Sequence, residues 1–511
     1  MIKKIEIIRG PGSVLYGSSA YVGVINVVTK TGEETEKEVS TGVGSFGARY
    51  STLTGGGKMG DVKIYASSKY FQNTGWKADA TDELRVSTTA QFGQIQWGTA
   101  VRLDYKDLSV DFFGARSQMD NIGTLPRYPQ HTSDVKNRTF FNLGYNPTLT
   151  DMFKLQTNFE YNFSHFELGL HPVYGPTRHT ASDYLVEAAL LGELSDDVNV
   201  IGGVVAERLT NPRGVFPVPT KYVLNNYNAY FQGDWKPVSK LKLIAGLQWN
   251  KPDGIDADVL PRASAIYNFN DNWGSKLNYG EAFRSAGAGV EAIIDFPGTL
   301  RGNPDLLPEK IKTTDVQVFC NYAKTQAAIT GFVSSYSDLI TRVTPAGSTT
   351  PTHINSGTQS AKGVELEGKY TPIKALYLIG SYTYQTNRKA GLDNITYVPV
   401  NMFKLGAVYQ YEKGIDLGLY DSYYGKPSDL NKTRPAVIYV NPEPKAFNWL
   451  SANLVFKLNK LFNISQDIQL ALYGENLLDE AVYLPEFNRG NINSLPGRSG
   501  RAYYSTLKWN F

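Results

Sequence analysis

The sequence predicts an all-β protein, and three features indicate a large antiparallel transmembrane β-barrel of about 22 strands. First, 33 Tyr, 24 Phe and 7 Trp stand beside 48 Gly in 511 residues, a composition that favours strands over helices. Second, apolar and polar residues alternate with period two from about residue 37 to the end. Third, short and long connections alternate, as in barrels with tight turns at one end and long loops at the other.

Two segments illustrate the alternation. In NYNAYFQGDW, Tyr227, Phe231 and Trp235 fall on one face, and Gln232 and Asp234 fall on the other. The final segment, RAYYSTLKWNF, likewise carries an apolar face that ends in aromatic residues. Each segment is therefore predicted to be a strand with one apolar and one polar side.

The connections between these segments fall into two classes. The short ones are predicted at 106–108, 146–151, 194–197, 236–240, 270–272, 371–374 and 412–414. The long ones are predicted at 73–96, 118–134, 167–180, 285–310, 387–397, 424–445 and 479–499. A soluble sandwich or propeller is the alternative, but the sequence has no repeat of blade length, and many strands are long enough for a tilted bilayer crossing.

Composition also excludes several classes of protein. A net charge of +3 with 19% charged residues gives no basic face for nucleic acid. No stretch approaches the roughly 18 apolar residues of a membrane helix. The single cysteine, Cys320, and the absence of zinc-site spacing predict no metal or cofactor. No G-x-S-x-G elbow appears, and GVGSFG (42–47) is followed by a strand pattern rather than by the helix of a dinucleotide site, so we expect no enzyme.

The first residues do not follow the barrel pattern. IEIIRG is predicted to be a short strand, Pro11 and Gly12 a turn, and Ser13 the N-cap of a helical turn, VLYG. VGVINVVTK is predicted to be a strand buried on both faces, and TGEETEKE (31–38) a solvated hinge. Because barrels of this size hold a plug in the lumen, residues 1–35 are predicted to belong to a plug and 36–511 to form the barrel.

Four ordered stretches resemble one known family. IEIIRGPGSVLYGSSAYVGVINVVTK (5–30) resembles the last part of the plug domain of TonB-dependent outer-membrane receptors. YGEAFRS with GNPDLLPEK, NSGTQSAKGVELEGKYTPIKALYLIGSYTY, and ENLLDEAVY with PGRSGRAYYSTLKWNF agree in order, so the resemblance covers the whole chain. It implies a signal for the barrel assembly machinery at Trp509 and Phe511. It also implies a plug motif made of Arg9, Gly10, Pro11, Gly12, Leu15, Tyr16 and Gly17.

The resemblance implies a function and partners. It implies TonB-dependent uptake of a scarce, bulky small-molecule ligand, of the iron–siderophore or cobalamin class, across the lipid outer membrane of a Gram-negative bacterium. The TonB–ExbB–ExbD complex would supply energy by pulling on a TonB box. We expect this box, the signal peptide and the rest of the plug to lie upstream of the printed sequence. The alternative is a passive or adhesive barrel, or a non-functional fragment, without TonB coupling.

Candidate ligand contacts are aromatic and cationic residues in the predicted outer loops, because pockets combine aromatic walls with a few polar groups. Solvated loop residues without a ligand are the alternative. FRSA (283–286) and NPDL (303–306) resemble boxes of haem receptors, but no histidine lies between them, which disfavours haem. The candidates are Trp76, Arg127, Tyr128, His171, Tyr174, Arg178, His179, Arg301, Tyr423 and Tyr424.

Arg9 has two readings. It is either a latch, paired with carboxylates of the barrel wall and released by pulling, or part of a structural ion pair or hydrogen-bonded turn. Buried charges need partners whatever the function, and the sequence alone favours the structural reading.

Overall fold

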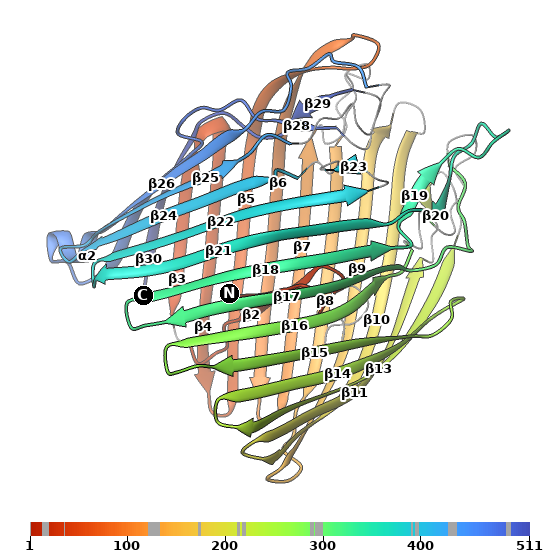
Figure 1. Ribbon diagram of the computed structural model, residues 1–511. Coiled ribbons are helices and arrows are strands. Elements are labelled where there is room, and N and C mark those ends of the chain that lie inside the picture. The colour runs from red at the N-terminus through yellow and green to blue at the C-terminus, as the bar shows by residue number, and fades with distance from the viewer. Residues whose placement is uncertain are drawn as a thin grey trace.

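A computed structural model describes residues 2–12, 20–34, 36–120, 133–171, 175–211, 215–216, 221–286, 291, 300–389, 392–393, 398–427, 437–486 and 492–511. It is a tilted cylinder of long strands with most of its loops at one end (Figure 1). Within these residues, 22 antiparallel strands form the closed barrel. The predicted fold class is confirmed.

The barrel closes when the last strand pairs with the first. Val39 of β3 (Lys37–Gly44) lies opposite Trp509 of β30 (Ala502–Asn510). Closure leaves no unpaired edge, which a membrane-spanning sheet requires. The other barrel strands are β4 (Ala48–Met59), β5 (Val62–Thr81), β6 (Ser87–Tyr105), β7 (Leu108–Asp120), β8 (Ser133–Tyr145), β9 (Phe153–His171), β10 (Gly175–Ser195), β11 (Val198–Asn211), β13 (Tyr222–Val238), β14 (Leu241–Pro252), β15 (Asp258–Asn268), β16 (Trp273–Arg284), β17 (Glu309–Asn321), β18 (Thr325–Ser337), β21 (Gln359–Ile373), β22 (Leu376–Lys389), β24 (Asn401–Tyr411), β25 (Ile415–Tyr424), β26 (Phe447–Lys457) and β27 (Asp467–Glu475).

Short elements supplement the barrel. The helix α2 (Leu458–Phe462) lies in the turn between β26 and β27, and no helix in the described part of the chain is long and apolar enough to cross a membrane. The 3-10 turn η1 (Ser45–Gly47) joins β3 to β4. The remaining strands are β12 (Val215–Phe216), β19 (Ile340–Val343), β20 (Thr352–Asn355), β23 (Leu392–Asp393), β28 (Tyr483–Pro485) and β29 (Ser494–Pro496).

The predicted tight turns all join consecutive barrel strands at one end of the cylinder. The predicted long loop at 167–180 was wrong, because β9 and β10 run through most of it, and so was the one at 73–96, where β5 and β6 leave only 82–86 as the connection. These strands have 20 and 19 residues, about twice what a bilayer crossing needs. The part of a strand that projects beyond the bilayer needs no apolar face. The polar sequence of β5 and β6 in this part was therefore predicted to be a loop.

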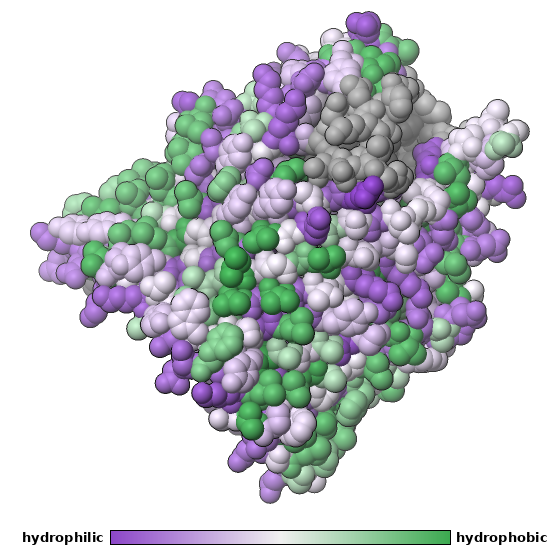
Figure 2. Space-filling model, viewed as in Figure 1, coloured by the Kyte–Doolittle hydropathy of each residue, from purple (hydrophilic) through white to green (hydrophobic). Residues whose placement is uncertain are grey.

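The alternation predicted for β13 is confirmed by exposure. Tyr227, Phe231 and Trp235 are 52%, 57% and 52% exposed on the outside, whereas Tyr230 is 8% exposed. The hydroxyl of Tyr230 donates a 2.8 Å hydrogen bond to Glu187 on the inner face. The view in Figure 2 accordingly shows hydrophobic side chains spread over the outer face of the strands.

A separate two-stranded sheet, which we call the luminal hairpin, lies inside the barrel. It consists of β1 (Ile2–Arg9) and β2 (Gly23–Thr29), with Ile7 opposite Ile25. The prediction that VGVINVVTK is buried on both faces was wrong, because Val22 and Ile25 are 65% and 70% exposed. Among the described residues no third strand joins the hairpin, so the outer edges of β1 and β2 have no strand partner there. The predicted helical turn with its cap, Ser13, falls outside the described residues.

Candidate functional site

The end of β1 turns sharply against the barrel wall. Gly10 adopts φ +77°, a left-handed conformation that favours glycine. The amide of Gly12 donates a 3.0 Å hydrogen bond to the carbonyl of Ala20. A Cβ built on Gly280 of β16 would lie 3.3 Å from the Pro11 carbonyl oxygen and 3.4 Å from its Cβ. The Arg-Gly-Pro-Gly turn is thus in close contact with the wall.

Arg9 bridges two carboxylates of the wall. Its guanidinium donates to Glu365 at 2.7 Å and to Glu367 at 2.5 Å, both on β21. The three side chains are 57%, 24% and 39% exposed, so water screens the ion pairs only in part. Both interpretations of Arg9, as a releasable latch and as part of a structural ion pair, require this contact, and it is present.

A second anchor, Tyr21, lies just before β2. The hydroxyl of Tyr21 donates a 3.1 Å hydrogen bond to the carbonyl of Lys310, and its ring lies 6.2 Å from that of Tyr336. Between the hairpin and the wall lies a cavity of about 590 Å³, lined by Arg9, Glu365 and residues of β16–β18. The hairpin is therefore held at its end while a cavity remains beside it.

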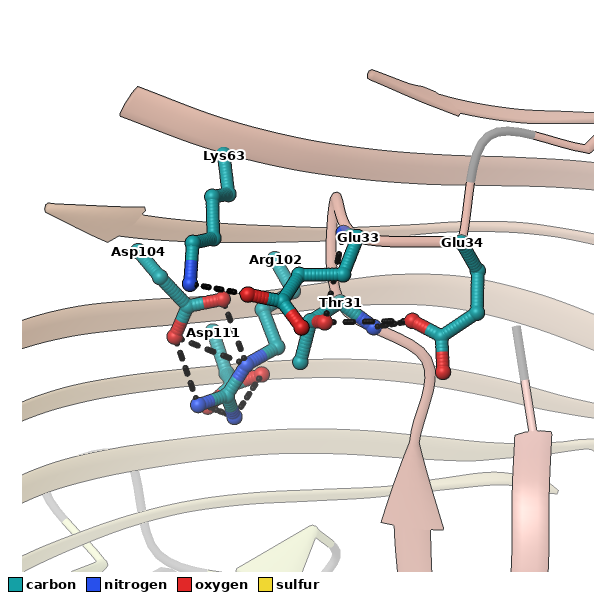
Figure 3. Close-up of polar contacts among 7 residues, drawn as sticks. All are labelled: Thr31, Glu33, Glu34, Lys63, Arg102, Asp104 and Asp111. Carbon is teal, nitrogen blue, oxygen red and sulfur yellow. Dashed lines mark hydrogen bonds and ion pairs between the residues drawn. The ribbon is translucent and has the colours of Figure 1, made fainter. Parts of the chain in front are cut away.

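The connector, residues 30–36, ties the hairpin to the first barrel strands. Glu33 pairs with Lys63 of β5 at 2.5 Å, and Glu34 accepts from the amide of Thr31 at 2.8 Å (Figure 3). Glu34 also pairs with Lys3 at 2.8 Å. The segment is solvated as predicted, since the side chains of Glu33 and Glu36 are 64% and 70% exposed, but ion pairs hold it against the hairpin and the wall. Nearby, Arg102 joins Asp104 and Asp111 at 2.7 and 2.9 Å (Figure 3).

Glycines let the connector approach the wall. A Cβ on Gly32 would lie 2.3 Å from the amide nitrogen of Ile64 and 2.5 Å from the carbonyl oxygen of Gly57. A Cβ on Gly56 would lie 2.5 Å from the carbonyl oxygen of Glu34. These distances are too short for any side chain, so the sequence TGGGK in β4 forms a smooth seat for the connector.

We expect Gly32→Val to detach the connector while the barrel stays closed. The new side chain collides with backbone of β4 and β5, so the ion pair between Glu33 and Lys63 is lost. Limited proteolysis at residues 30–36 should become at least several-fold faster. Gly60→Val is the control, because a Cβ there meets nothing within 4 Å, although its φ of +60° adds strain at that turn. Equal proteolysis of Gly32→Val and the parent chain would contradict this seating.

The connector should also respond to acid. Lys3 and hydrogen bonds from Thr31 hold the pKa of Glu34 at about 2, below its usual 4.5. A lowered pKa means that the contribution of the contact is present above pH 4.5 and is lost as the pH falls toward 2. The protection factor for amide exchange at Thr31, which corrects for the pH dependence of the intrinsic exchange rate, should therefore fall only in this acid range. A fall in the protection factor near pH 6 would contradict it.

The predicted ligand contacts lie in several sectors of the barrel. Trp76 stacks on Phe92 at 4.2 Å, and the guanidinium of Arg178 pairs with Glu167 at 3.2 Å. His179 lies 3.4 Å from the hydroxyl of Tyr222. Arg301 bridges to Thr352 through backbone hydrogen bonding, and its side chain is exposed.

The two tyrosines of β25 point in opposite directions. Tyr423 packs against Phe403, which is 44% exposed on the outer face, whereas Tyr424 stacks on Phe447 at 5.1 Å. In the described part of the chain, no hydrogen bond or ring contact joins any two of the candidate side chains. Arg127, Tyr128, Tyr174 and the side chain of His171, like Leu15, Tyr16 and Gly17 of the plug motif, fall outside the description.

The FRSA and NPDL stretches hold loops together. Arg284 donates to Glu309 at 2.7 Å, and Glu309 accepts from the amide of Ile340 at 2.8 Å. The side chain of Asn303 donates to the carbonyl of His353 at 2.9 Å. These contacts link the segment after β16 to the β19–β20 hairpin, which gives both boxes a structural role.

The C-terminus has the expected aromatic ending. Trp509 and Phe511 are 47% and 59% exposed on the outer face, and their rings lie 5.1 Å apart. The amide of Phe511 donates to the carbonyl of Lys37 at 3.0 Å, which seals the barrel seam. Their role as an assembly signal remains a proposal.

The wall partners of the hairpin and the connector, Glu365, Glu367, Lys63 and Gly57, were not predicted from the sequence. A signal for the first two exists in VELEG (364–368), where both acidic residues share one face of a strand whose other face is apolar. Charged residues repeated on the inner face of a lumen are candidates for contact with whatever fills it.

A 22-strand barrel with an apolar outer face, a polar lumen and an anchored hairpin inside defines a receptor-type barrel of the bacterial outer membrane. The chain matches the family described as TonB dependent receptor-like, beta-barrel over residues 26–477. The chain therefore belongs to this family, and it is an outer-membrane protein.

Known relatives agree with this assignment. The vitamin B12 transporter BtuB of Vibrio vulnificus is 22% identical over 384 residues, which cover 72% of this chain and 60% of that protein. The iron-regulated outer membrane virulence protein of Vibrio cholerae is 20% identical, covering 95% of this chain and 77% of that protein.

Solved structures share the fold. The FrpB iron transporter of Neisseria meningitidis superposes with a TM-score of 0.79 at 14% identity, covering all of this chain and 87% of that one. The siderophore receptor PirA of Acinetobacter baumannii gives 0.75 at 16% identity, with coverage of 100% and 85%. The family and these relatives are receptors and transporters, not enzymes.

Proposed function

We propose that the protein takes up a scarce, bulky ligand of the iron–siderophore or cobalamin class by TonB-dependent active transport. Residues 1–35 are the C-terminal part of its plug domain, and residues 36–511 are its barrel. The observation that carries the proposal is the hairpin anchored inside the lumen by Arg9, Tyr21 and the connector. Partly exposed ion pairs of this kind are weak enough to be broken by pulling.

The TonB–ExbB–ExbD complex is the proposed energy source. Binding energy alone cannot concentrate a ligand, and only a coupled input can drive repeated release of the hairpin. The names of the relatives support the ligand class, because they include a vitamin B12 transporter, an iron transporter and a siderophore receptor. In this proposal Arg9 acts as the latch.

The test is uptake in whole cells with the protein expressed from its own gene. Cells that lack other receptors are given radiolabelled ferric siderophores or cobalamin, with and without TonB. We expect accumulation of one ligand class that is lost when TonB is deleted. Accumulation that persists without TonB, together with steady conductance in planar bilayers, would contradict coupling and favour a passive barrel.

A further inference from the structure

An apolar groove of about 570 Å³, which we call the outer groove, lies on the outside of the wall. It crosses β16, β17, β18, β21, β22 and β24, which lie side by side at the front of Figure 1. One cross-strand row runs along it and consists of Trp273, Cys320, Ala327, Gly368, Gly380 and Leu405. Because this row faces away from the lumen, a plug inside the barrel does not cover it.

The groove arises from a step in side-chain height. Gly368 lies opposite Gly380, whereas two residues further along the same outer face Leu366 and Phe403 are 42% and 44% exposed. The wall is therefore lower along the row than beside it. An unfilled space next to lipid forfeits dispersion contacts. An acyl chain fits this place, because the groove is continuous with the lipid-facing surface of the barrel.

The groove begins at the level of the lipid headgroups. Trp273 is the first residue of β16, and its indole nitrogen donates a 2.9 Å hydrogen bond to the hydroxyl of Tyr322 in the neighbouring turn. Exposed Trp and Tyr residues favour the boundary between acyl chains and headgroups. Gly380, the fifth residue of β22, lies about 13 Å further along its strand.

This depth corresponds to one leaflet. The hydrocarbon core of a bilayer is about 30 Å thick, so the groove ends near its middle. Tight turns mark the periplasmic end of an outer-membrane barrel. The groove therefore lies in the inner leaflet, which faces the periplasm.

Positive charge lies at the periplasmic end of the groove. Lys324 in the β17–β18 turn and Lys374 in the β21–β22 turn are exposed. The amine of Lys324 donates to the carbonyl of Pro372 at 3.2 Å, which joins the two turns. Neither lysine makes an ion pair with any residue that the structure describes. The turns on either side carry Asp271 and Glu412, so the excess positive charge is confined to the groove.

We propose that the outer groove binds an anionic phospholipid of the inner leaflet. One acyl chain lies over Gly368 and Gly380, and the phosphate lies beside Lys324 and Lys374. Ammonium groups hold phosphate through charge-assisted hydrogen bonds, whereas a zwitterionic headgroup brings a cation of its own to the same place. The inference concerns the outside of the wall and does not depend on the proposed uptake.

Native mass spectrometry of the full-length protein in detergent tests the site. Phosphatidylglycerol and phosphatidylethanolamine are the probes, added at equal concentration, and the parent protein should retain phosphatidylglycerol preferentially. Lys324→Gln/Lys374→Gln should weaken its binding roughly tenfold. Gly368→Leu should weaken it several-fold, because a Cβ there meets only the carbonyl oxygen of Gln326, at 4.0 Å. The new side chain therefore fills the groove without displacing the wall.

Each variant has a matched control outside the groove. Gly331→Leu adds the same side chain to the outer face of β18, where a Cβ meets nothing within 4 Å. Lys236→Gln/Lys240→Gln removes two exposed lysines at the β13–β14 turn. There the amine of Lys240 likewise donates to a carbonyl of a neighbouring turn, that of Phe269, at 3.3 Å. Both controls should bind phosphatidylglycerol as the parent does.

Cys320 reports where the lipid binds, because it is the only cysteine of the printed sequence and it lines the groove. Phosphatidylglycerol should slow alkylation of its thiol by an uncharged maleimide in the parent protein. It should not do so in Lys324→Gln/Lys374→Gln. Unchanged alkylation despite bound lipid would place the lipid elsewhere and overturn the inference.

Two other results would also overturn it. One is equal retention of phosphatidylglycerol by the parent and both groove variants, or retention no stronger than that of phosphatidylethanolamine. The other is a pair of protein copies without lipid that Gly368→Leu separates, because the groove would then hold a second copy of the chain.

Discussion

Phe231→Arg is expected to lower the free energy of unfolding in lipid vesicles by about 2–4 kcal/mol. Phe231 lies near the centre of β13 and is 57% exposed on the outer face. Placing a guanidinium at this depth of a bilayer requires it to lose water without a partner, since Gly202, its cross-strand neighbour on β11, has no side chain. Urea unfolding from vesicles measures the loss.

Gln232→Arg is the matched control, one residue further along the same strand. Gln232 points into the lumen and is partly exposed, so the longer arginine can extend its charge into water and the change should be under about 1 kcal/mol. A larger loss for Gln232→Arg than for Phe231→Arg would mean that the strand presents its other face to lipid. Because a shift of one residue inverts every side chain, this pair tests the register of the wall.

The second large effect is expected from Glu365→Gln/Glu367→Gln. This double change removes both carboxylates that hold Arg9 and leaves their shape nearly unchanged. The lost contacts contribute about 1–2 kcal/mol after allowance for partial exposure. An isolated hairpin is marginal in water, so amide exchange in β1 and β2 should accelerate roughly tenfold.

Asp315→Asn is the control for this experiment. Asp315 lines the cavity beside the hairpin, but it accepts from Asn278 of the wall rather than from the hairpin. Exchange in β1 and β2 should stay as in the parent chain. Unchanged exchange in the double variant would mean that Tyr21 and the connector suffice, and that Arg9 is no latch.

The barrel wall was predictable because its physics is local. Alternation in NYNAYFQGDW assigns lipid and lumen faces by itself, and tight turns such as KDL mark strand ends regardless of distant residues. The extent of β5 and β6 was not predictable, since strand that projects into water needs no apolar face. Burial of β2 was also mispredicted, because an apolar run does not reveal how many neighbours cover it.

The contacts of the hairpin could not be predicted from the sequence, for a different reason. Arg9 meets residues more than 350 positions away, and no local pattern specifies that distance. The seat for the connector depends on Gly32 meeting Gly57 across two segments. The alternation in VELEG would have identified both acidic partners as luminal. It could not have identified the cation that they bind.

The most direct test of energised uptake is to lock the hairpin to the wall with a disulfide. Pro11→Cys/Gly280→Cys suits this purpose, because Cβ atoms at these positions lie 3.4 Å apart, close to disulfide spacing. TonB-dependent ligand uptake is then measured in cells under oxidising and reducing conditions, with each single variant as control. If the hairpin must leave the wall, uptake stops when the bond forms and returns on reduction. Undiminished uptake through the oxidised double variant would contradict that requirement.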